Sequence, residues 1–345
     1  MTGCIPFADR KIPQVGAALT RRDRLGAIKA RWGIGRMNYR IDPGLYALGN
    51  PDSQSDILVT ANYKMSFDSL RNALPRRNAW ILVLDTNGIN VWCAAGKSTF
   101  GTGELVRKIK SSRLPELVSH RRLIVPQLGA PGIAAHLVKK ETGFAVVYGP
   151  ILSADLPEFI ASGYEATPFM RTKRFPFRER LALIPMELIP ALKYALIVIC
   201  LMDILAGFAG PGTFVQNTLT HSFFAAMMMT GGLIAGSVLT PAMLPLLPGK
   251  AFAFKGMTAG LMASAIICLF FLTDPSLFPG LLSAFGATMV SAGLASFLGM
   301  NFTGASTYTS LSGVRKEMKI AVPLQILAGI TGLLLWMASL CSKIT

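Results

Sequence analysis

Hydrophobic residues divide the chain into two parts of different character. From residue 190 onward the apolar runs are long, and each is close to the roughly 20 residues that a helix needs to cross a bilayer. These runs lie at 190–209, 223–248, 252–272, 278–300 and 320–341. Earlier in the chain the apolar runs are short and polar residues separate them. The pattern predicts a polar N-terminal part followed by an all-α transmembrane bundle of five helices.

Short apolar runs and amphipathic segments alternate in the N-terminal part. The residues at 79–84 are apolar at every position, which is typical of a parallel strand covered on both faces. Further strands are predicted at 56–60, 123–125 and 144–148, and helices at 67–74, 103–110, 131–140 and 157–161. This alternation predicts an α/β domain with a parallel, Rossmann-like sheet. No regular element is assigned to the first 50 residues.

Composition and charge narrow the class of protein. Hydrophobic residues make up 52% of the 345 residues, and the net charge is +16. No basic motif interleaved with aromatic residues supports nucleic-acid binding, so the basic excess points to membrane lipid as the partner. The five cysteines have no paired spacing, so no disulfide framework is expected and a reducing cytoplasm suits the chain. The N-terminus has no apolar run typical of a signal peptide.

Domain boundaries and topology follow from these features. We expect an N-terminal extension over 1–50, the α/β domain over 51–165, a basic linker over 166–189 and the transmembrane domain over 190–345. Basic residues precede the first span and occupy the connections after the second and fourth spans. These residues are Arg171, Lys173, Arg174, Arg178, Arg180, Lys250, Lys255, Arg315, Lys316 and Lys319. The positive-inside rule then places the α/β domain in the cytoplasm and the C-terminus outside a multi-pass cell membrane.

Two features inside the spans have a chemical interpretation. Asp203 interrupts the first span, and we interpret it as a carboxylate paired within the bundle near one interface; a polar path is the alternative. Gly232 with Gly236, and Ser291 with Ala295, have the spacing at which small residues let helices approach closely. They predict a compact bundle.

A lone cysteine follows the buried strand at 79–84. After the turn at residues 85–88, Asn90 is a natural N-cap, which places Cys93 in the first turn of a short helix. The positive end of a helix favours a thiolate, and Lys97, four residues on, acts in the same direction. The carboxyl ends of parallel strands are where open α/β sheets bind ligands. Cys93 is therefore a candidate metal ligand, and a small buried core residue is the alternative.

Other motifs are less specific. The run Gly96-Lys97-Ser98 is not a P-loop, because a Walker A motif requires glycine five residues before Gly96 and that position is Val91. Gly129 and Gly132 open a predicted helix after a strand, so they could receive a phosphate or form a plain turn. His120 and His136 have no carboxylate or cysteine at ligand spacing, and His136 is expected to cap or pack its helix.

The residues from Asn90 to Phe100, Asn-Val-Trp-Cys-Ala-Ala-Gly-Lys-Ser-Thr-Phe, resemble the signature of the membrane-bound corrinoid proteins of mercury methylation (HgcA type). Ser98 stands at the variable position of that motif. Residues 122–160 and the five hydrophobic spans also resemble this family, so the likeness covers roughly residues 50 to 340. A more distant similarity is to the large subunit of the corrinoid iron–sulfur protein.

The resemblance implies a corrinoid-binding domain and a methyltransferase activity. In that family the cysteine is the lower axial ligand of the cobalt in a cobalamin-type corrinoid, and methyl-cobalt transfers its methyl group to inorganic Hg(II), forming methylmercury. This role falls on Cys93, as cobalt ligand and catalytic residue. The residues carried over as cofactor contacts are Asn90, Val91, Trp92, Ala94, Ala95, Gly96, Lys97, Thr99 and Phe100. The small residues Ala94, Ala95 and Gly96 are expected to let a planar macrocycle approach the helix.

Three weaker cofactor contacts complete the predicted site. Thr60 ends a core strand on the expected side of the cofactor and is a candidate hydrogen-bond partner. Gly129 and Gly132 are candidates for the polar tail of the corrinoid. The resemblance also implies a ferredoxin-like iron–sulfur protein (HgcB type) as electron donor and mercury donor, and a methyl donor of the folate type. The alternative is a membrane-anchored corrinoid methyl carrier of one-carbon metabolism, and a transport or anchoring protein is the third reading.

Overall fold

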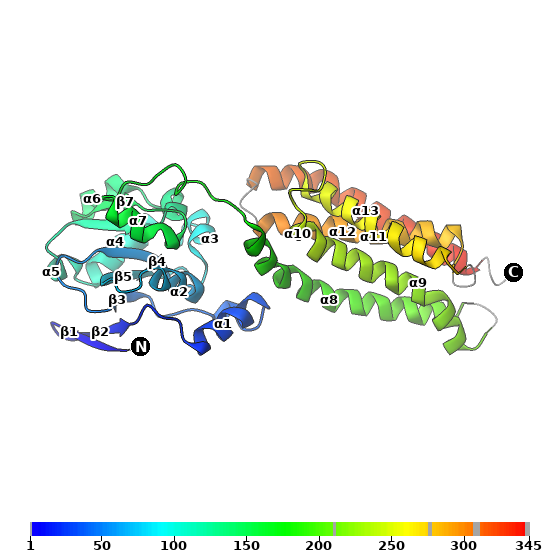
Figure 1. Ribbon diagram of the computed structural model, residues 1–345, viewed down its shortest axis with the longest axis horizontal. Helices are drawn as coiled ribbons and strands as arrows, with labels where there is room; N and C mark the ends of the chain where they lie inside the picture. Colours follow the sequence, from blue (N-terminus) through cyan, green and yellow to red (C-terminus); the bar gives the residue numbers. More distant parts are fainter. Residues whose placement is uncertain (1, 210–211, 275–277, 306–310, 342–345) are drawn as a thin grey trace. The chain divides into compact units, whose positions relative to one another are not determined.

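The structure, a computed structural model, describes residues 2–209, 212–274, 278–305 and 311–341. Its contacts divide the chain into two compact units, Met1–Arg174 and Phe175–Thr345 (Figure 1). The first unit is α/β and the second is helical, as the sequence predicts. The domain boundaries drawn from the sequence remain predictions, and each unit is described by itself below.

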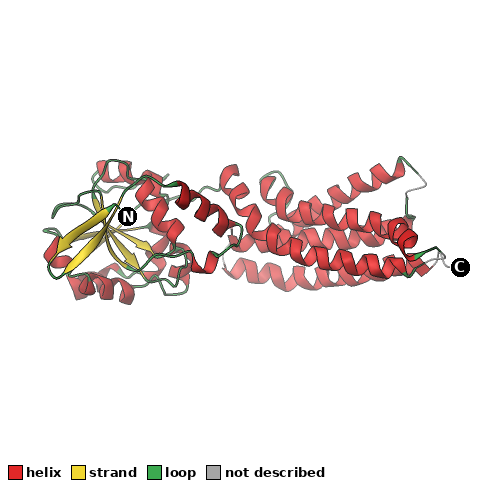
Figure 2. Cartoon of the chain, turned by 90° about the horizontal axis from the view of Figure 1, so that it is seen from below, coloured by secondary structure: helices red, strands yellow, loops and turns green. Residues whose placement is uncertain are grey.

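One mixed, mostly parallel sheet forms the centre of the first unit, with the strand order β1-β2-β3-β5-β4-β6-β7 (Figure 2). The strands are β1 (Gly3–Phe7), β2 (Arg10–Val15), β3 (Gly44–Leu48), β4 (Ile57–Ala61), β5 (Ala79–Leu84), β6 (Arg122–Val125) and β7 (Ala145–Tyr148). The last four run parallel and lie within a residue of the predicted strands. β3 pairs antiparallel with β5, and β1 pairs antiparallel with β2. The predicted Rossmann-like core is therefore confirmed and extended on one side.

Helices cover both faces of this sheet. On one face lie α3 (Val91–Gly96), α4 (Thr102–Ser111) and α6 (Ala135–Thr142), and on the other α2 (Lys64–Asn72) and α7 (Leu156–Ala161). Every residue of β4 and β5 is buried, because both faces of these strands are covered. Strand alternation sends Val59 and Ala61 to the α3 side and Leu58 to the α2 side. Two short elements complete this part of the unit, α5 (Leu114–Leu117) and the 3-10 helix η3 (Ser153–Asp155).

The first 50 residues belong to this unit and were assigned no element from the sequence. They contribute β1, β2, β3, the helix α1 (Arg21–Arg31) and the 3-10 helix η1 (Arg36–Asn38). β1 and β2 each contain a proline, β1 is largely exposed, and β2 buries only Ile12 and Val15, so neither has the alternation of a half-buried strand. β2 pairs with β3, which lies against the central strand β5, and β1 pairs with β2.

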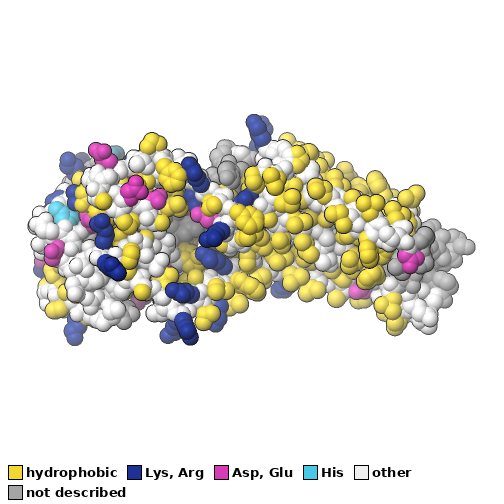
Figure 3. All heavy atoms as spheres, in the orientation of Figure 1, with side chains coloured by type: hydrophobic (Ala, Val, Ile, Leu, Met, Phe, Trp, Pro, Cys, Tyr) yellow, Lys and Arg dark blue, Asp and Glu magenta, His cyan; other side chains and the backbone are white. Residues whose placement is uncertain are grey.

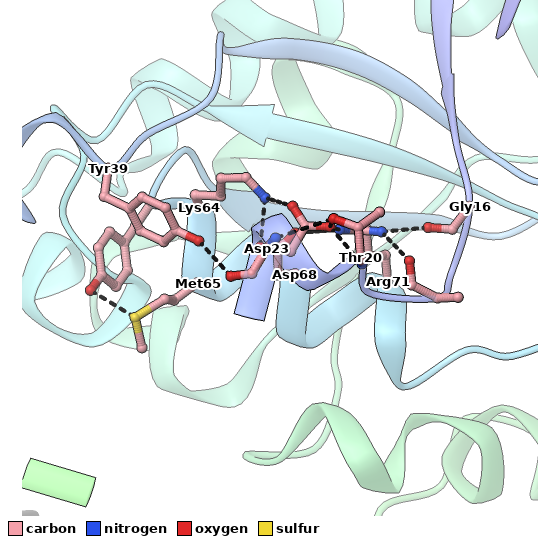
Figure 4. A network of polar contacts seen from close by, with 10 residues as sticks. Gly16, Thr20, Asp23, Tyr39, Lys64, Met65, Asp68 and Arg71 are labelled. Carbon is pink, nitrogen blue, oxygen red and sulfur yellow. Dashed lines mark hydrogen bonds and ion pairs between the residues drawn. The ribbon is translucent and has the colours of Figure 1, made fainter. Parts of the chain in front are cut away.

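A buried network of charges ties α1 to α2 (Figure 4). Asp23 accepts hydrogen bonds from Lys64 Nζ (2.6 Å) and Arg71 Nη2 (2.8 Å) and forms a capping box with Thr20. Asp68 pairs with the same two cations, and Arg71 also donates to the carbonyl oxygen of Gly16. Burial opposes the ionisation of Asp23, but the hydrogen bonds from Lys64, Thr20 and Arg71 hold its pKa well below the usual range.

The second unit contains five helices that are long and apolar enough to cross a membrane among the residues described. They are α8 (Phe177–Gly207), α9 (Phe214–Ile234), which continues through the π-helical turn η4 (Ala235–Leu239) into α10 (Thr240–Ala242), α11 (Phe252–Leu272), α12 (Leu281–Asn301) and α13 (Leu311–Cys341). A 3-10 turn, η5 (Phe302–Ala305), follows α12. α8, α9 and α13 begin before the predicted spans, because charged residues in α8 and α13 and polar residues in α9 continue each helix beyond its apolar stretch.

Small residues set the close packing of this bundle, as predicted. A Cβ atom on Gly232 would lie 2.7 Å from the carbonyl oxygen of Ser291, and one on Gly236 would lie 2.8 Å from the Cα of Ala295. α9 and its π-helical turn therefore approach the backbone of α12. Asp203 is half-buried near the C-terminal end of α8. The predicted pairing of its carboxylate remains a prediction.

Candidate functional site

The loop after β5 is held by a buried asparagine. Asn62 directly follows β4 and is 2% exposed. Its Oδ1 accepts hydrogen bonds from the backbone N–H groups of Thr86 (3.1 Å) and Gly88 (2.9 Å), and its Nδ2 donates to Asp85 (3.2 Å). Asn62 is not among the site residues predicted from the sequence. The available signal was a side-chain amide immediately after a mostly apolar strand, at the sheet edge where ligands bind.

The loop leads into α3 through the predicted N-cap. Asn90 Oδ1 accepts a hydrogen bond from the backbone N–H of Cys93 at 2.9 Å, which confirms Asn90 as the cap and places Cys93 in the first helical turn. α3 ends at Gly96, and Lys97 is its C-cap. The local geometry around the cysteine therefore follows from the sequence of the motif itself.

The two faces of α3 have different surroundings. Val91, Ala94 and Ala95 are buried in the hydrophobic core on this side of the sheet. Trp92, Cys93 and Gly96 face outward, and Trp92 is 48% exposed. Ala94 and Ala95 were expected to be small so that a macrocycle could approach the helix, and this was wrong. Both face the core, where small side chains let α3 pack closely on the protein. A macrocycle on the outward face would meet Gly96. The alternative of Cys93 as a buried core residue is excluded, because Cys93 is exposed.

Space beside Cys93 is open. Among the residues that the structure describes, a Cβ atom added to Gly96, one helical turn from Cys93, would have no heavy atom within 4 Å. Lys97 and Ser98 are also exposed, and Ser98 has a φ of 62°, in the left-handed region. Thr99 is half-buried and its hydroxyl lies 3.4 Å from the carbonyl oxygen of Ala94. The surface around Cys93 is therefore accessible to solvent.

Phe100 and the two glycines form the support beneath α3. Phe100 is fully buried. A Cβ on Gly129 would lie 2.4 Å from the ring of Phe100, and one on Gly132 would lie 2.1 Å from its carbonyl oxygen. These glycines belong to the 3-10 helix η2 (Gln127–Gly132), and their lack of a side chain is explained by this close approach. The structure therefore favours the interpretation of Gly129 and Gly132 as part of a turn, because both are needed for close packing against Phe100.

The remaining candidates lie apart from the outward face of α3. Thr60 is buried and, two residues after Leu58, shares the sheet face covered by α2, opposite the face of α3. His120 Nε2 lies 3.0 Å from the carbonyl oxygen of Ser55, and His120 Nδ1 accepts from the N–H of Arg122. His136 is exposed in the first turn of α6. The structure does not bring Thr60 to Cys93.

The donor set at Cys93 limits the kind of metal site. Within the part of the chain that the structure describes, no group of three His, Cys, Asp or Glu residues could hold a metal ion. A metal bound to Cys93 would therefore take most of its ligands from outside the described residues. A planar macrocycle that supplies four ligands and leaves an axial position for one thiolate fits the exposed thiol and the open surface at Gly96.

Comparisons with known proteins find similarity over about a third of the chain, and the family match lies within the first unit. Residues 34–160 match the family model described as CO dehydrogenase/acetyl-CoA synthase delta subunit. The gamma subunit of the acetyl-CoA decarbonylase/synthase complex from Methanopyrus kandleri is 34% identical over 123 residues, 35% of this chain and 26% of that protein. The subunit of the same name from Methanocaldococcus jannaschii is 31% identical over 130 residues, 36% of this chain and 26% of that protein. The chain spans about a quarter of the length of these relatives, and the matched region contains β3 to β7 and α3 but none of the five long apolar helices.

Proposed function

We propose that the first unit binds a corrinoid with the Cys93 thiolate as lower axial ligand of its cobalt, and that the protein transfers a methyl group to inorganic Hg(II). The observation that carries the proposal is the exposed Cys93 on a capped helix beside an open surface. Two further lines support it: the motif from Asn90 to Phe100 and the similarity to acetyl-CoA decarbonylase/synthase gamma subunits. When bound, such a corrinoid supplies a cobalt centre that can carry a methyl group.

The residues of the chain have separate tasks in this proposal. Asn90 fixes the first turn of α3, so the direction of the Cys93 side chain is set before the cofactor binds. Gly96 leaves room for a planar group, and Trp92 offers an apolar surface at its edge. Phe100 supports the helix from below. The Cys93 thiolate would hold the cobalt and donate electron density to it, and the bound group would then supply a methyl group for the electrophile Hg(II).

The partners and the location belong to the same proposal. We place the first unit in the cytoplasm and the C-terminus outside the cell membrane, because basic residues flank the inner connections. A folate-type compound would donate the methyl group. The two electrons that restore the cofactor after each transfer would come from a ferredoxin-like iron–sulfur protein (HgcB type).

The test compares two exposed thiols of the same unit. The full chain is purified with bound corrinoid, its cobalt absorption spectrum is recorded, and methylmercury formation is measured in cells. Cys93→Ala should change the spectrum and abolish methylmercury formation, because alanine cannot donate to cobalt. Cys4→Ala is the matched control, since Cys4 is also exposed and should change neither. An unaltered spectrum in Cys93→Ala would refute the ligand assignment.

A second candidate function is favoured by the comparisons. The relatives are named as gamma subunits of the acetyl-CoA decarbonylase/synthase complex, so a methyl carrier of one-carbon metabolism is the alternative, with mercury as an incidental substrate. With the wild-type protein and a folate-type methyl donor, the rate of methyl transfer to Hg(II) is compared with the rate of transfer to a thiol acceptor. Transfer to the thiol that is much faster than transfer to Hg(II) would select this alternative, whereas Cys93-dependent transfer that is faster to Hg(II) than to the thiol supports the first proposal.

A further inference from the structure

The helix α1 has two faces with opposite surroundings. Its inner face packs on the first unit: Ala30 is fully buried, and a Cβ on Gly26 would lie 2.8 Å from the ring of Tyr39. On the outer face, Leu25, Ile28 and Trp32 are 58%, 49% and 51% exposed. At about 100° per residue, positions 25, 28 and 32 form one stripe opposite the packed face.

Basic residues border this apolar stripe on both sides. Arg24 and Arg31 lie along one flank and Arg22 and Lys29 along the other, by the same helical rotation. Arg21 lies at the N-terminal end of the stripe. All five are exposed, and the one acidic residue of α1, Asp23, points inward to Lys64 and Arg71. In the space-filling view, Lys and Arg side chains gather beside hydrophobic ones in the region of α1 (Figure 3).

The stripe continues beyond the helix and is held in place. Ile34 and Met37 follow at 61% and 77% exposed, so large apolar side chains extend into η1. The network around Asp23 fixes α1 on the unit, with Arg71 bonded to Asp23 and to the carbonyl oxygens of Gly16 and Ala18 (Figure 4). Rotation of α1 to bury its outer face would break these bonds. The apolar stripe is thus a rigid, outward surface.

We propose that the outer face of α1 binds the surface of an anionic lipid bilayer. An apolar stripe with Lys and Arg on both flanks is the arrangement by which a helix lies in the plane of a membrane interface. The chain itself favours lipid over a soluble partner, because the first unit ends at Arg174 and the candidate membrane span α8 begins at Phe177. This short connection keeps α1 at a high local concentration near a bilayer. The proposal does not depend on what Cys93 binds.

Quenching of Trp32 fluorescence by brominated lipids tests the proposal on the full chain in nanodiscs. The Trp32→Phe variant is measured in parallel, so the difference in emission isolates Trp32 from the other three tryptophans. We expect Trp32 to be quenched in discs that contain phosphatidylglycerol, and less so in discs of phosphatidylcholine alone or at high salt. Arg21→Gln/Arg22→Gln should weaken the contact by roughly fivefold per arginine, at about 1 kcal/mol each.

A matched control uses basic residues on another exposed helix. Lys139→Gln/Lys140→Gln removes the same charge from α6, where no apolar stripe accompanies the lysines, and should leave Trp32 quenching unchanged. Absence of Trp32 quenching in anionic discs would overturn the proposal. If Trp32 emission then changed only on addition of an iron–sulfur protein, α1 would be a protein-docking surface instead. An equal loss of Trp32 quenching in the α1 double variant and the α6 double variant would also overturn the proposal. Binding would then depend on the net charge of the unit and not on the outer face of α1.

Discussion

Replacement of Gly96 by alanine separates the stability of α3 from its capacity to hold a cofactor. A Cβ at Gly96 meets no heavy atom within 4 Å, so Gly96→Ala adds no clash in the protein. Alanine is favoured over glycine in a helix by roughly 0.5–1 kcal/mol, and the last position of α3 should give the lower end of that range. A macrocycle packed on the outward face would meet the added methyl group, at a cost of about 1–3 kcal/mol. That cost corresponds to about a five- to 150-fold loss of corrinoid affinity.

Two measurements on the purified full chain test this expectation: corrinoid retained per mole of protein and thermal unfolding of the first unit, followed by emission of the buried Trp80. Gly103→Ala is the matched control, because Gly103 also faces open space but lies on α4. Gly132→Ala is expected to destabilise the unit, since its Cβ would lie 2.1 Å from the carbonyl oxygen of Phe100. Undiminished corrinoid in Gly96→Ala would refute the placement of the macrocycle over this face.

The remaining predictions concern charge, backbone and topology. Asp23→Asn should lower the unfolding free energy of the first unit by about 3 kcal/mol at neutral pH. Because the folded pKa of Asp23 is depressed, this difference should be complete above the ordinary aspartate pKa near 4 and shrink as pH falls below it, which denaturant titrations at several pH values can check. Ser98→Gly should raise the unfolding free energy by about 1 kcal/mol, because φ is 62° there; an unchanged midpoint would contradict this. A reporter fused to the C-terminus should be external and one inserted at Lys250 cytoplasmic, and a cytoplasmic C-terminal reporter would remove one crossing.

Local patterns were sufficient for the elements around Cys93. The all-apolar run at 79–84 predicted β5, and Asn90 three residues before Cys93 predicted the cap, since an N-cap bond joins residues close in sequence. The five long apolar helices followed from hydropathy and length. β1, β2 and α1 were missed because β1 and β2 each contain a proline and β1 is an edge strand, and because α1 is held by ion pairs to a helix distant in sequence.

The amino-acid sequence by itself determined the α/β unit, the apolar helices, and the cysteine on a capped turn after a buried strand. Each of these depends on periodicity or on contacts within a few residues. Only the tertiary structure decided which side of α3 is free. Ala94 and Ala95 turn inward, while Cys93 and Gly96 turn outward, because α3 rests on Phe100 and on the glycines of η2. The roles of Asn62, Gly129 and Gly132 likewise arise from residues far apart in the chain, whose contacts form only when the sheet assembles.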